Sequence, residues 1–208
     1  AIAQDRRPQC HAMGAELVRA AGERHQGDPG RLVMGALDHG VISDGLLAFL
    51  FVDLHAPADT DVWLAGGIAP DPAFDREWPQ GGGVLVHFDG AAFTRFDLGE
   101  GALLAVDGLG VDVWAVGLGG AVAHVSGDVV STYRMPGRPI LRDVLVRAAD
   151  DVWIVGDQST VVHWDGARFE QVSAGLPSKL LSFTTLSSAE GHVVVGGPTR
   201  ALTLEPPR

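Results

Sequence analysis

Short apolar stretches alternate with turns rich in Gly, Asp and Ser through most of the chain after residue 45. Runs of four to seven mostly apolar residues, bounded by such turns, predict the strands of an antiparallel meander. One set of candidates is Leu103 to Val106, Asp112 to Val116, Ala121 to His124 and Val129 to Tyr133. The next set has the same order, at Val144 to Arg147, Asp151 to Val155, Thr160 to Trp164 and Arg168 to Val172.

The tripeptide Asp-Val-Trp marks the repeat. It occurs three times, and its tryptophans are Trp63, Trp114 and Trp153. Trp114 and Trp153 are 39 positions apart, and so are His124 and His163, so a whole unit repeats in register. Self-similarity with a period of about 40 residues in a strand-rich chain is typical of propeller blades.

The first unit carries an insertion. It starts with a strand predicted at Leu46 to Val52, and its His87 follows Trp63 by 24 positions. In the other two units this separation is 10 positions, so the difference is 14 residues, and it falls between Ile68 and Gly82. Insertions in repeats map to loops on one face, often the binding face.

The last unit is degenerate. Its predicted strands are Leu180 to Thr185, His192 to Val195 and Ala201 to Leu204, with Val193 in the Trp place and Thr203 in the His place. The sequence therefore predicts an all-β fold, a β-propeller of about four recognisable four-stranded blades, with the last blade incomplete. An open array of blades leaves unpaired strand edges.

Residues 1–44 do not repeat and form an N-terminal extension ahead of the propeller repeats at residues 45–208. The helical spacing of Met13, Leu17, Val18 and Ala21 predicts a short helix that either packs on the propeller or docks a partner.

Three ways to close the ring of blades remain open. Residues Arg31 to Ala36 supply the missing strand, a larger ring includes other chains, or an irregular cap covers the edge.

Composition excludes several classes. With 15 basic and 26 acidic residues, the net charge of -11 argues against binding nucleic acid or an anionic membrane surface. The longest apolar run, Gly45 to Val52, is too short to span a membrane. A single cysteine, Cys10, permits neither an intrachain disulfide nor a cysteine-based zinc site. Because the chain begins with Ala1 rather than Met, removal of a leader is one expectation.

Three strings carry a family resemblance: DVWAVG at residues 112–117, DVWIVG at 151–156 and VHWDG at 162–166. They resemble a widespread bacterial repeat found in β-propeller proteins, many of them predicted to be exported. The resemblance implies the propeller fold and a periplasmic or extracellular location, but no activity, because propellers host enzymes, lectins and scaffolds. Neither the Asp-box pattern of sialidases nor the pairing typical of WD40 repeats is present.

The repeated residues are interpreted as structural. His87, His124 and His163 share one position on the third strand, where packing against the neighbouring Trp is favoured over a metal site. The repeated Trp63, Trp114 and Trp153 predict packing between blades, with stacking on sugars as the alternative. The aspartates Asp61, Asp112 and Asp151, just before the second strand, are expected to fix the turn through backbone N–H groups.

The insertion is the candidate interaction loop, because it mixes charges with two aromatic residues, as protein interfaces do. Its residues are Asp71, Phe74, Asp75, Arg76, Glu77 and Trp78. A calcium site is a weaker alternative, at the oxygen-rich segment that holds Asp53, His55, Asp59 and Asp61.

No nucleophile elbow, phosphate-binding glycine loop or His-Glu-x-x-His motif is present, so the sequence nominates no catalytic residue, metal or cofactor. The predicted function is a non-catalytic binding or scaffolding propeller, a subunit or accessory protein in a larger assembly with a protein partner. The alternatives are a carbohydrate-binding, lectin-like propeller and a propeller hydrolase or lactonase with a metal site.

Overall fold

The computed structural model describes residues 41–43, 48–68, 82–172, 181–198 and 201–204. The predicted helix around residues 13–21 and the closing strand at residues 31–36 lie outside them. Contacts divide the chain into two compact units, residues 1–102 and 103–208. No helix among the described residues is long and apolar enough to cross a membrane.

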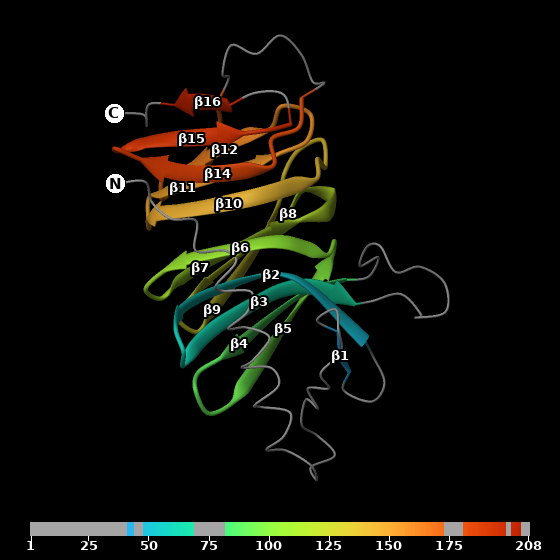
Figure 1. The fold of residues 1–208 in the computed structure, drawn as a ribbon. Helices are drawn as coiled ribbons and strands as arrows, with labels where there is room; N and C mark the ends of the chain where they lie inside the picture. Colours follow the sequence, from blue (N-terminus) through green and yellow to red (C-terminus); the bar gives the residue numbers. More distant parts are fainter. Residues whose placement is uncertain (1–40, 44–47, 69–81, 173–180, 199–200, 205–208) are drawn as a thin grey trace. The chain divides into compact units, whose positions relative to one another are not determined.

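The first unit contains one antiparallel sheet, here sheet A, with the strand order β1-β2-β3-β4-β5 (Figure 1). Its strands are β1 (Val41–Ser43), β2 (Ala48–Ala58), β3 (Asp61–Ile68), β4 (Gly82–Phe88) and β5 (Phe93–Glu100). Strand β1 extends the expected four-stranded meander by pairing with β2. The core of this sheet is built on Val62, Leu64, Val84 and Val86.

The second unit contains three sheets, each a meander of neighbouring strands. Sheet B has strands β6 (Leu103–Leu109), β7 (Asp112–Gly117), β8 (Ala121–Ser126) and β9 (Val129–Arg134), with the short 3-10 turn η1 (Leu118–Gly120) between β7 and β8. Sheet C has β10 (Leu141–Ala148), β11 (Asp151–Gly156), β12 (Val161–Trp164) and β13 (Phe169–Gln171). Sheet D has three strands, β14 (Thr185–Ala189), β15 (His192–Gly196) and β16 (Ala201–Leu204).

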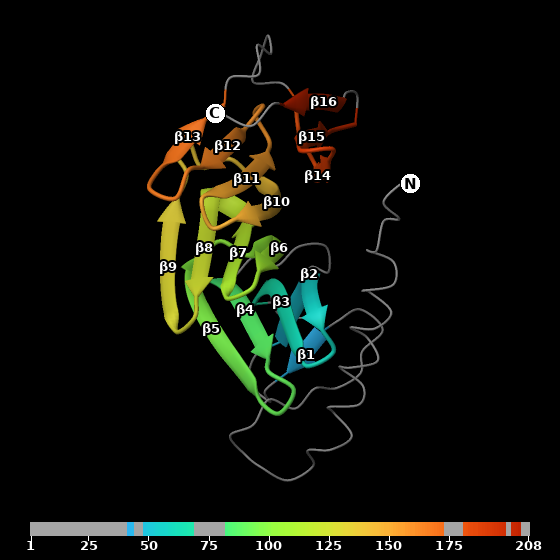
Figure 2. The ribbon, with the colours of Figure 1, turned by 90° about the vertical axis from the view of Figure 1, so that its left-hand side faces the viewer.

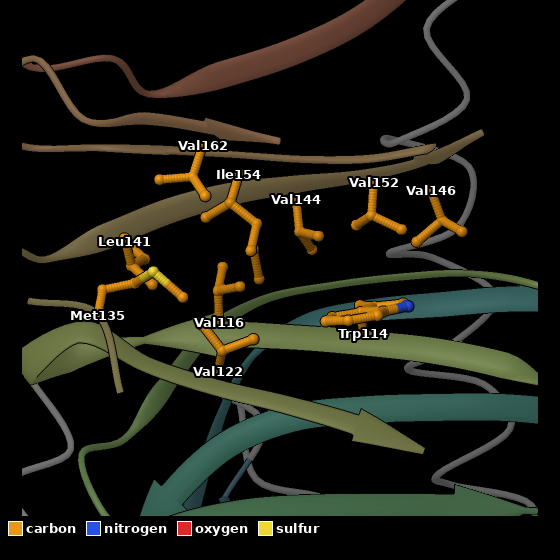
Figure 3. Packing of buried hydrophobic residues seen from close by; sticks show 11 residues of the cluster. Trp114, Val116, Val122, Met135, Leu141, Val144, Val146, Val152, Ile154 and Val162 are labelled. Atoms are coloured by element: carbon orange, nitrogen blue, oxygen red, sulfur yellow. The ribbon is translucent and has the colours of Figure 1, made fainter. Parts of the chain in front are cut away.

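Within this unit, sheet C packs between sheets B and D. Strand β10 lies between β6 and β14 in both views (Figures 1 and 2). Figure 3 shows Val144, Val146 and Val152 of sheet C on one side of the indole of Trp114 from sheet B. On the other side, Trp153 of sheet C shares a core with Phe183 and with sheet D. Burial of both faces explains why the central strands β7 and β11 are nearly continuous apolar runs.

Aspartate carboxylates tie successive sheets together through backbone N–H groups. Asp107 on β6 accepts a hydrogen bond of 2.8 Å from the N–H of Val146 on β10. Asp143, buried on β10, accepts one of 2.6 Å from the N–H of Leu186 on β14. Each bond joins the first strand of one sheet to the first strand of the next, so the sheets are held by directed bonds as well as by apolar packing.

The predicted all-β fold is confirmed, and the last unit has three strands among the described residues, but its alignment is corrected. Its first strand is Thr185–Ala189, not Leu180 to Thr185. The turn at Glu190 and Gly191, both with positive φ (51° and 84°), sets the register of this hairpin. His192 therefore takes the Asp position of the repeat, and Val194, rather than Val193, takes the Trp position, paired with Thr203.

The buried indole of Trp114 gives a direct test of this packing. Trp114 is 0% exposed, so Trp114→Ala should lower the free energy of unfolding by about 3–5 kcal/mol, as expected for a large-to-small core change. Urea unfolding followed by far-UV circular dichroism measures the difference. The control Val129→Ala, at a 65% exposed position, should change stability by less than about 0.5 kcal/mol. Equal losses in both variants would contradict the packing described here.

Candidate functional site

The repeated Trp and His residues face each other across the second and third strands of three sheets. The cross-strand pairs are Trp63 with His87, Trp114 with His124 and Trp153 with His163. Ring centroids are 4.0 Å, 3.9 Å and 4.6 Å apart in the three pairs. The rings of the first two pairs are nearly parallel.

The repeated aspartates hold these rings. Asp61 Oδ1 accepts hydrogen bonds from Trp63 Nε1 (3.0 Å) and His87 Nε2 (2.8 Å). In sheet C, Asp151 Oδ1 accepts the same two bonds, at 2.6 Å from the Trp153 indole and 3.0 Å from His163. The aspartates were expected to bind backbone N–H groups of the turn. In the structure their carboxylates bind side chains of their own sheet instead.

Sheet B has a weaker version of this arrangement. Asp112 Oδ1 accepts a bond of 3.0 Å from His124 Nε2, as in the other sheets. The Trp114 Nε1 is buried, however, and has no hydrogen-bond partner among the described residues. The same three residue types therefore make two bonds in sheets A and C and one in sheet B.

This geometry bears on the metal and sugar interpretations. Each histidine directs Nε2 to the aspartate of its own sheet, and the three indoles are buried. Buried indole faces are not available to stack on a sugar. Among the residues that the structure describes, no three His, Cys, Asp or Glu side chains form a group that could hold a metal ion, and these residues include Asp53, His55, Asp59 and Asp61.

The predicted interaction loop lies outside the described residues. It follows β3, which ends at Ile68, and precedes β4, which begins at Gly82. The residues concerned are Asp71, Phe74, Asp75, Arg76, Glu77 and Trp78. Their proposed role in partner contact therefore stays a prediction.

In sheet C, an ion pair holds the loop that follows the second strand, β11. Arg142 at the start of β10 forms two bonds to Asp157, Nε to Oδ1 at 2.6 Å and the terminal nitrogen to Oδ2 at 2.9 Å. The hydrogen bond from Arg142, with a further one from Ser182, holds the pKa of the Asp157 carboxyl below its ordinary value. Two neighbouring residues of this loop, Gln158 and Ser159, have positive φ, and the N–H of Ser159 bonds to the Leu181 carbonyl.

The opposite end of sheet B exposes apolar side chains. Leu109, Val111, Val129 and Val130 are 54%, 68%, 65% and 38% exposed, and they lie at the β6–β7 and β8–β9 turns. The two turns are joined by a hydrogen bond of 3.1 Å from the Gly127 N–H to the Val111 carbonyl. Val129 and Val130 follow each other along β9 and therefore point to opposite faces of the sheet. The four exposed residues share this end of the sheet, which is here called the sheet B tip.

The other sheets lack this surface at equivalent positions. All four sheets have a two-residue turn between their first and second strands, so their turns can be compared position by position. The position of Leu109 is occupied by Ala58, Ala148 and Ala189 in the other sheets, and the position of Val111 by Thr60, Asp150 and Gly191. Only sheet B places large apolar side chains there.

The turn between the third and fourth strands explains why the sheet B tip is open. In sheets A and C this turn has the form Asp-Gly-x-x, and its glycine folds back against the first turn. A Cβ on Gly90 would lie 2.7 Å from Thr60 Cβ, and one on Gly166 would lie 2.9 Å from Asp150 Cβ. In sheet B the turn is the shorter pair Gly127-Asp128, and a Cβ on Gly127 would meet nothing within 4 Å.

Acidic residues are frequent in the turns at this end of the sheets of the second unit. The turns at this end of sheets B, C and D carry Asp112, Asp128, Asp150, Asp151, Asp165 and Glu190. The basic residues at the same turns are Arg147 and Arg168, paired with Asp151 and Asp165. The apolar surface is thus set in a region of net negative charge.

Sequence reasoning placed the interaction site on the loop between the second and third strands and missed the sheet B tip. A signal was available. When the first turns are aligned, Leu-Gly-Val-Asp at residues 109–112 stands out against Ala-Asp-Thr-Asp, Ala-Ala-Asp-Asp and Ala-Glu-Gly-His. The importance of this difference follows from the structure, where the short turn Gly127-Asp128 leaves the side chains of Leu109 and Val111 exposed.

Comparison with known proteins identifies the fold. No protein-family model matches the chain, and no curated protein matches it. Among solved structures, the chain is similar to YCF48 bound to a D1 peptide, with a TM-score of 0.53 and 13% sequence identity. The match covers 76% of this chain and 52% of YCF48, so this chain spans about half the length of that protein. The chain has the β-propeller fold.

The repeated aspartates make unequal numbers of bonds, which predicts unequal effects of their removal. Asp151→Ala removes the acceptor for both the Trp153 and His163 rings, so it should lower the free energy of unfolding by about 1–3 kcal/mol. The matched change Asp112→Ala removes only the bond to His124 and should cost less. Urea unfolding of both variants measures the difference, and a larger loss for Asp112→Ala would refute the assignment.

The Arg142–Asp157 pair predicts an acid-dependent part of stability. Because the pKa of Asp157 is lower in the folded chain than its ordinary value of 3.8, the pair stabilises the fold at neutral pH. This contribution should be lost as the pH falls below 3.8 and through the lower folded-state pKa. Asp157→Asn should therefore destabilise the chain at pH 7 and flatten the decline in melting temperature below pH 5.

The control for this pH series is Asp150→Asn, which makes the same charge change on an exposed turn. It should leave the acid-side decline close to that of the unchanged chain. A decline equally steep in the unchanged chain and in Asp157→Asn would show that the pair contributes nothing to acid sensitivity.

Proposed function

We propose that this chain is a non-catalytic binding module that holds a protein partner at the sheet B tip. The observation that carries the proposal is the exposure of Leu109 and Val111 at positions where the other sheets have small or polar residues, with the exposed Val129 and Val130 at the adjoining turn. Contiguous exposed apolar side chains rimmed by polar groups mark interaction sites. Burial of one Leu or Val side chain contributes about 1.5–3 kcal/mol, so a partner covering this surface gains affinity from it.

The surroundings of the tip favour a partner segment of a particular chemistry. Aspartates at the neighbouring turns make the rim acidic, with Asp128 directly between Gly127 and Val129. A segment that places apolar side chains on the tip and Lys or Arg side chains on the rim is complementary to both features. The bound D1 peptide in the YCF48 structure is a precedent for a propeller of similar fold that binds a peptide.

The wider role that fits this module is a subunit or accessory protein of a larger assembly. The resemblance of the DVWAVG and VHWDG strings to exported bacterial propellers supports a periplasmic or extracellular location. These statements rest on the proposed binding role and on that resemblance. The insertion at residues 69–81 offers a second contact for the same partner.

The proposal is tested by replacing residues of the sheet B tip with those found at the same positions of another sheet. The double variant Leu109→Ala, Val111→Thr places the residue types of sheet A at both positions. Both side chains are exposed, so folding should be unchanged, whereas affinity for the native partner should fall by more than about tenfold, which corresponds to about 1.4 kcal/mol. Partner proteins are isolated with the unchanged chain from its native source, and their affinities are then measured by calorimetry.

The matched control makes the reciprocal change on sheet C, Ala148→Leu with Asp150→Val, which adds apolar residues to the same turn elsewhere. This variant should bind the partner as the unchanged chain does. Undiminished affinity of the sheet B variant would refute the tip as the binding surface.

A further inference from the structure

We infer that the open edge of strand β9 pairs with β9 of a second copy of this chain, antiparallel, with Asp128 of each copy opposite Arg134 of the other. This interaction goes beyond partner binding at the sheet B tip. Val129 and Val130 of the sheet B tip belong to β9 and would lie in this interface, whereas Leu109 and Val111 lie outside β9 and remain available to the partner. Self-pairing would join two four-stranded sheets into one continuous sheet.

Strand β9 lacks the features that normally protect a strand edge. Such edges are blunted by shortness, charged side chains, proline or a bulge. Among the described strands, β5 is interrupted by a register shift and carries Arg95, Asp97 and Glu100. Strand β13 has three residues, and β16 has four. Strand β9 has six residues in an unbroken register, and Arg134 at its end carries its one charge.

The hydrogen-bond pattern of β9 fixes which of its groups face outward. A two-residue turn joins Ser126 to Val129, so these two residues form the first hydrogen-bonded pair of the hairpin. Hydrogen-bonded and non-hydrogen-bonded pairs alternate along the hairpin from this point. Val129, Ser131 and Tyr133 therefore direct their N–H and C=O groups to β8. The backbone groups of Val130, Thr132 and Arg134 point to the open edge, where a further strand would pair.

In one antiparallel register, the outward-facing backbone groups of the two strands pair and opposite charges also face each other. Outward-facing residues must pair with outward-facing residues, which places Val130 opposite Thr132 of the second copy. The same register places Asp128 opposite Arg134, and the two-fold symmetry makes that pair twice. A shift of two residues in either direction keeps the backbone pattern but separates both charges from their partners.

The other side chains of β9 fit this register. Val129, which is 65% exposed, comes opposite Tyr133 of the second copy, and β-branched with aromatic is a favourable cross-strand pair. The terminal nitrogen of Arg134 donates a hydrogen bond to the Gly119 carbonyl at 3.1 Å. A guanidinium has five N–H donors, so it can keep this bond and also reach a carboxylate. The match of the strand with its own sequence favours a second copy over an unrelated strand.

The experiment is sedimentation equilibrium of the full chain over a range of concentrations, with charge-reversal variants. The mass should rise from 21.8 kDa toward twice that value, 43.6 kDa. Asp128→Arg alone or Arg134→Asp alone places like charges opposite each other twice, and each should raise the dissociation constant of the dimer by more than about tenfold. The double variant restores opposite charges and should return the constant to within about threefold of the original.

Two controls separate pairing from general charge effects. Asp150→Arg and Arg138→Asp make the same charge changes at exposed positions off β9, and they should leave dimerisation unchanged. Circular dichroism checks that every variant is folded. A chain that stays at 21.8 kDa up to about 200 μM, a range that detects even weak association, or a double variant as defective as the single ones, would overturn the assignment.

Hydrogen exchange gives an independent readout that does not depend on any substitution. In the dimer the amides of Val130 and Thr132 should exchange more slowly as protein concentration rises, whereas that of Ser131, already bonded to β8, should not change. Protection of the Val130 and Thr132 amides only after an unrelated protein is added would mean that the edge takes a different strand, and the second-copy assignment would be wrong.

Discussion

The cross-strand contact between Trp and His, held by an aspartate, is the constraint on which the registers of sheets A, B and C depend. A slip of one residue between the second and third strands would turn every side chain to the opposite face. The pairing of Trp153 with His163, with both rings bonded to Asp151, is incompatible with such a slip. The same arrangement fixes sheet A, and a version with one bond fewer fixes sheet B.

This framework leaves the turns free to differ. The apolar faces and the strand-to-strand bonds of Asp107 and Asp143 hold the sheets of the second unit together along their first strands, and at the turns a bond is added, from Arg147 to the Gly191 carbonyl. Differences between sheets therefore gather where they cost little stability. The short Gly127-Asp128 turn and the apolar pair Leu109 and Val111 are such differences, and both occur in the same sheet. Function in repeat folds commonly resides in such local departures from the repeat.

Much of the fold could be predicted from the sequence, because the central strands are marked by apolar runs and the first three units by Asp-Val-Trp. The alignment of the last unit could not, since it has no Trp and its register depends on the backbone of Glu190 and Gly191. The role of Asp61 and Asp151 was also missed. Sequence spacing suggested a turn, whereas their carboxylates reach an indole two residues on and a histidine on the next strand.

The candidate site was less predictable than the fold, for a physical reason. The longer turns of sheets A and C pack against the residues at the position of Val111, so the exposure of Val111 depends on a two-residue difference in turn length. The most direct test of the account compares hydrogen exchange of the chain in its native assembly with that of the isolated chain. Slower exchange at residues 109–112 and 126–130 in the assembly, with no change at turns 58–61 and 148–151, is the predicted result. Slower exchange only at those other turns would contradict it.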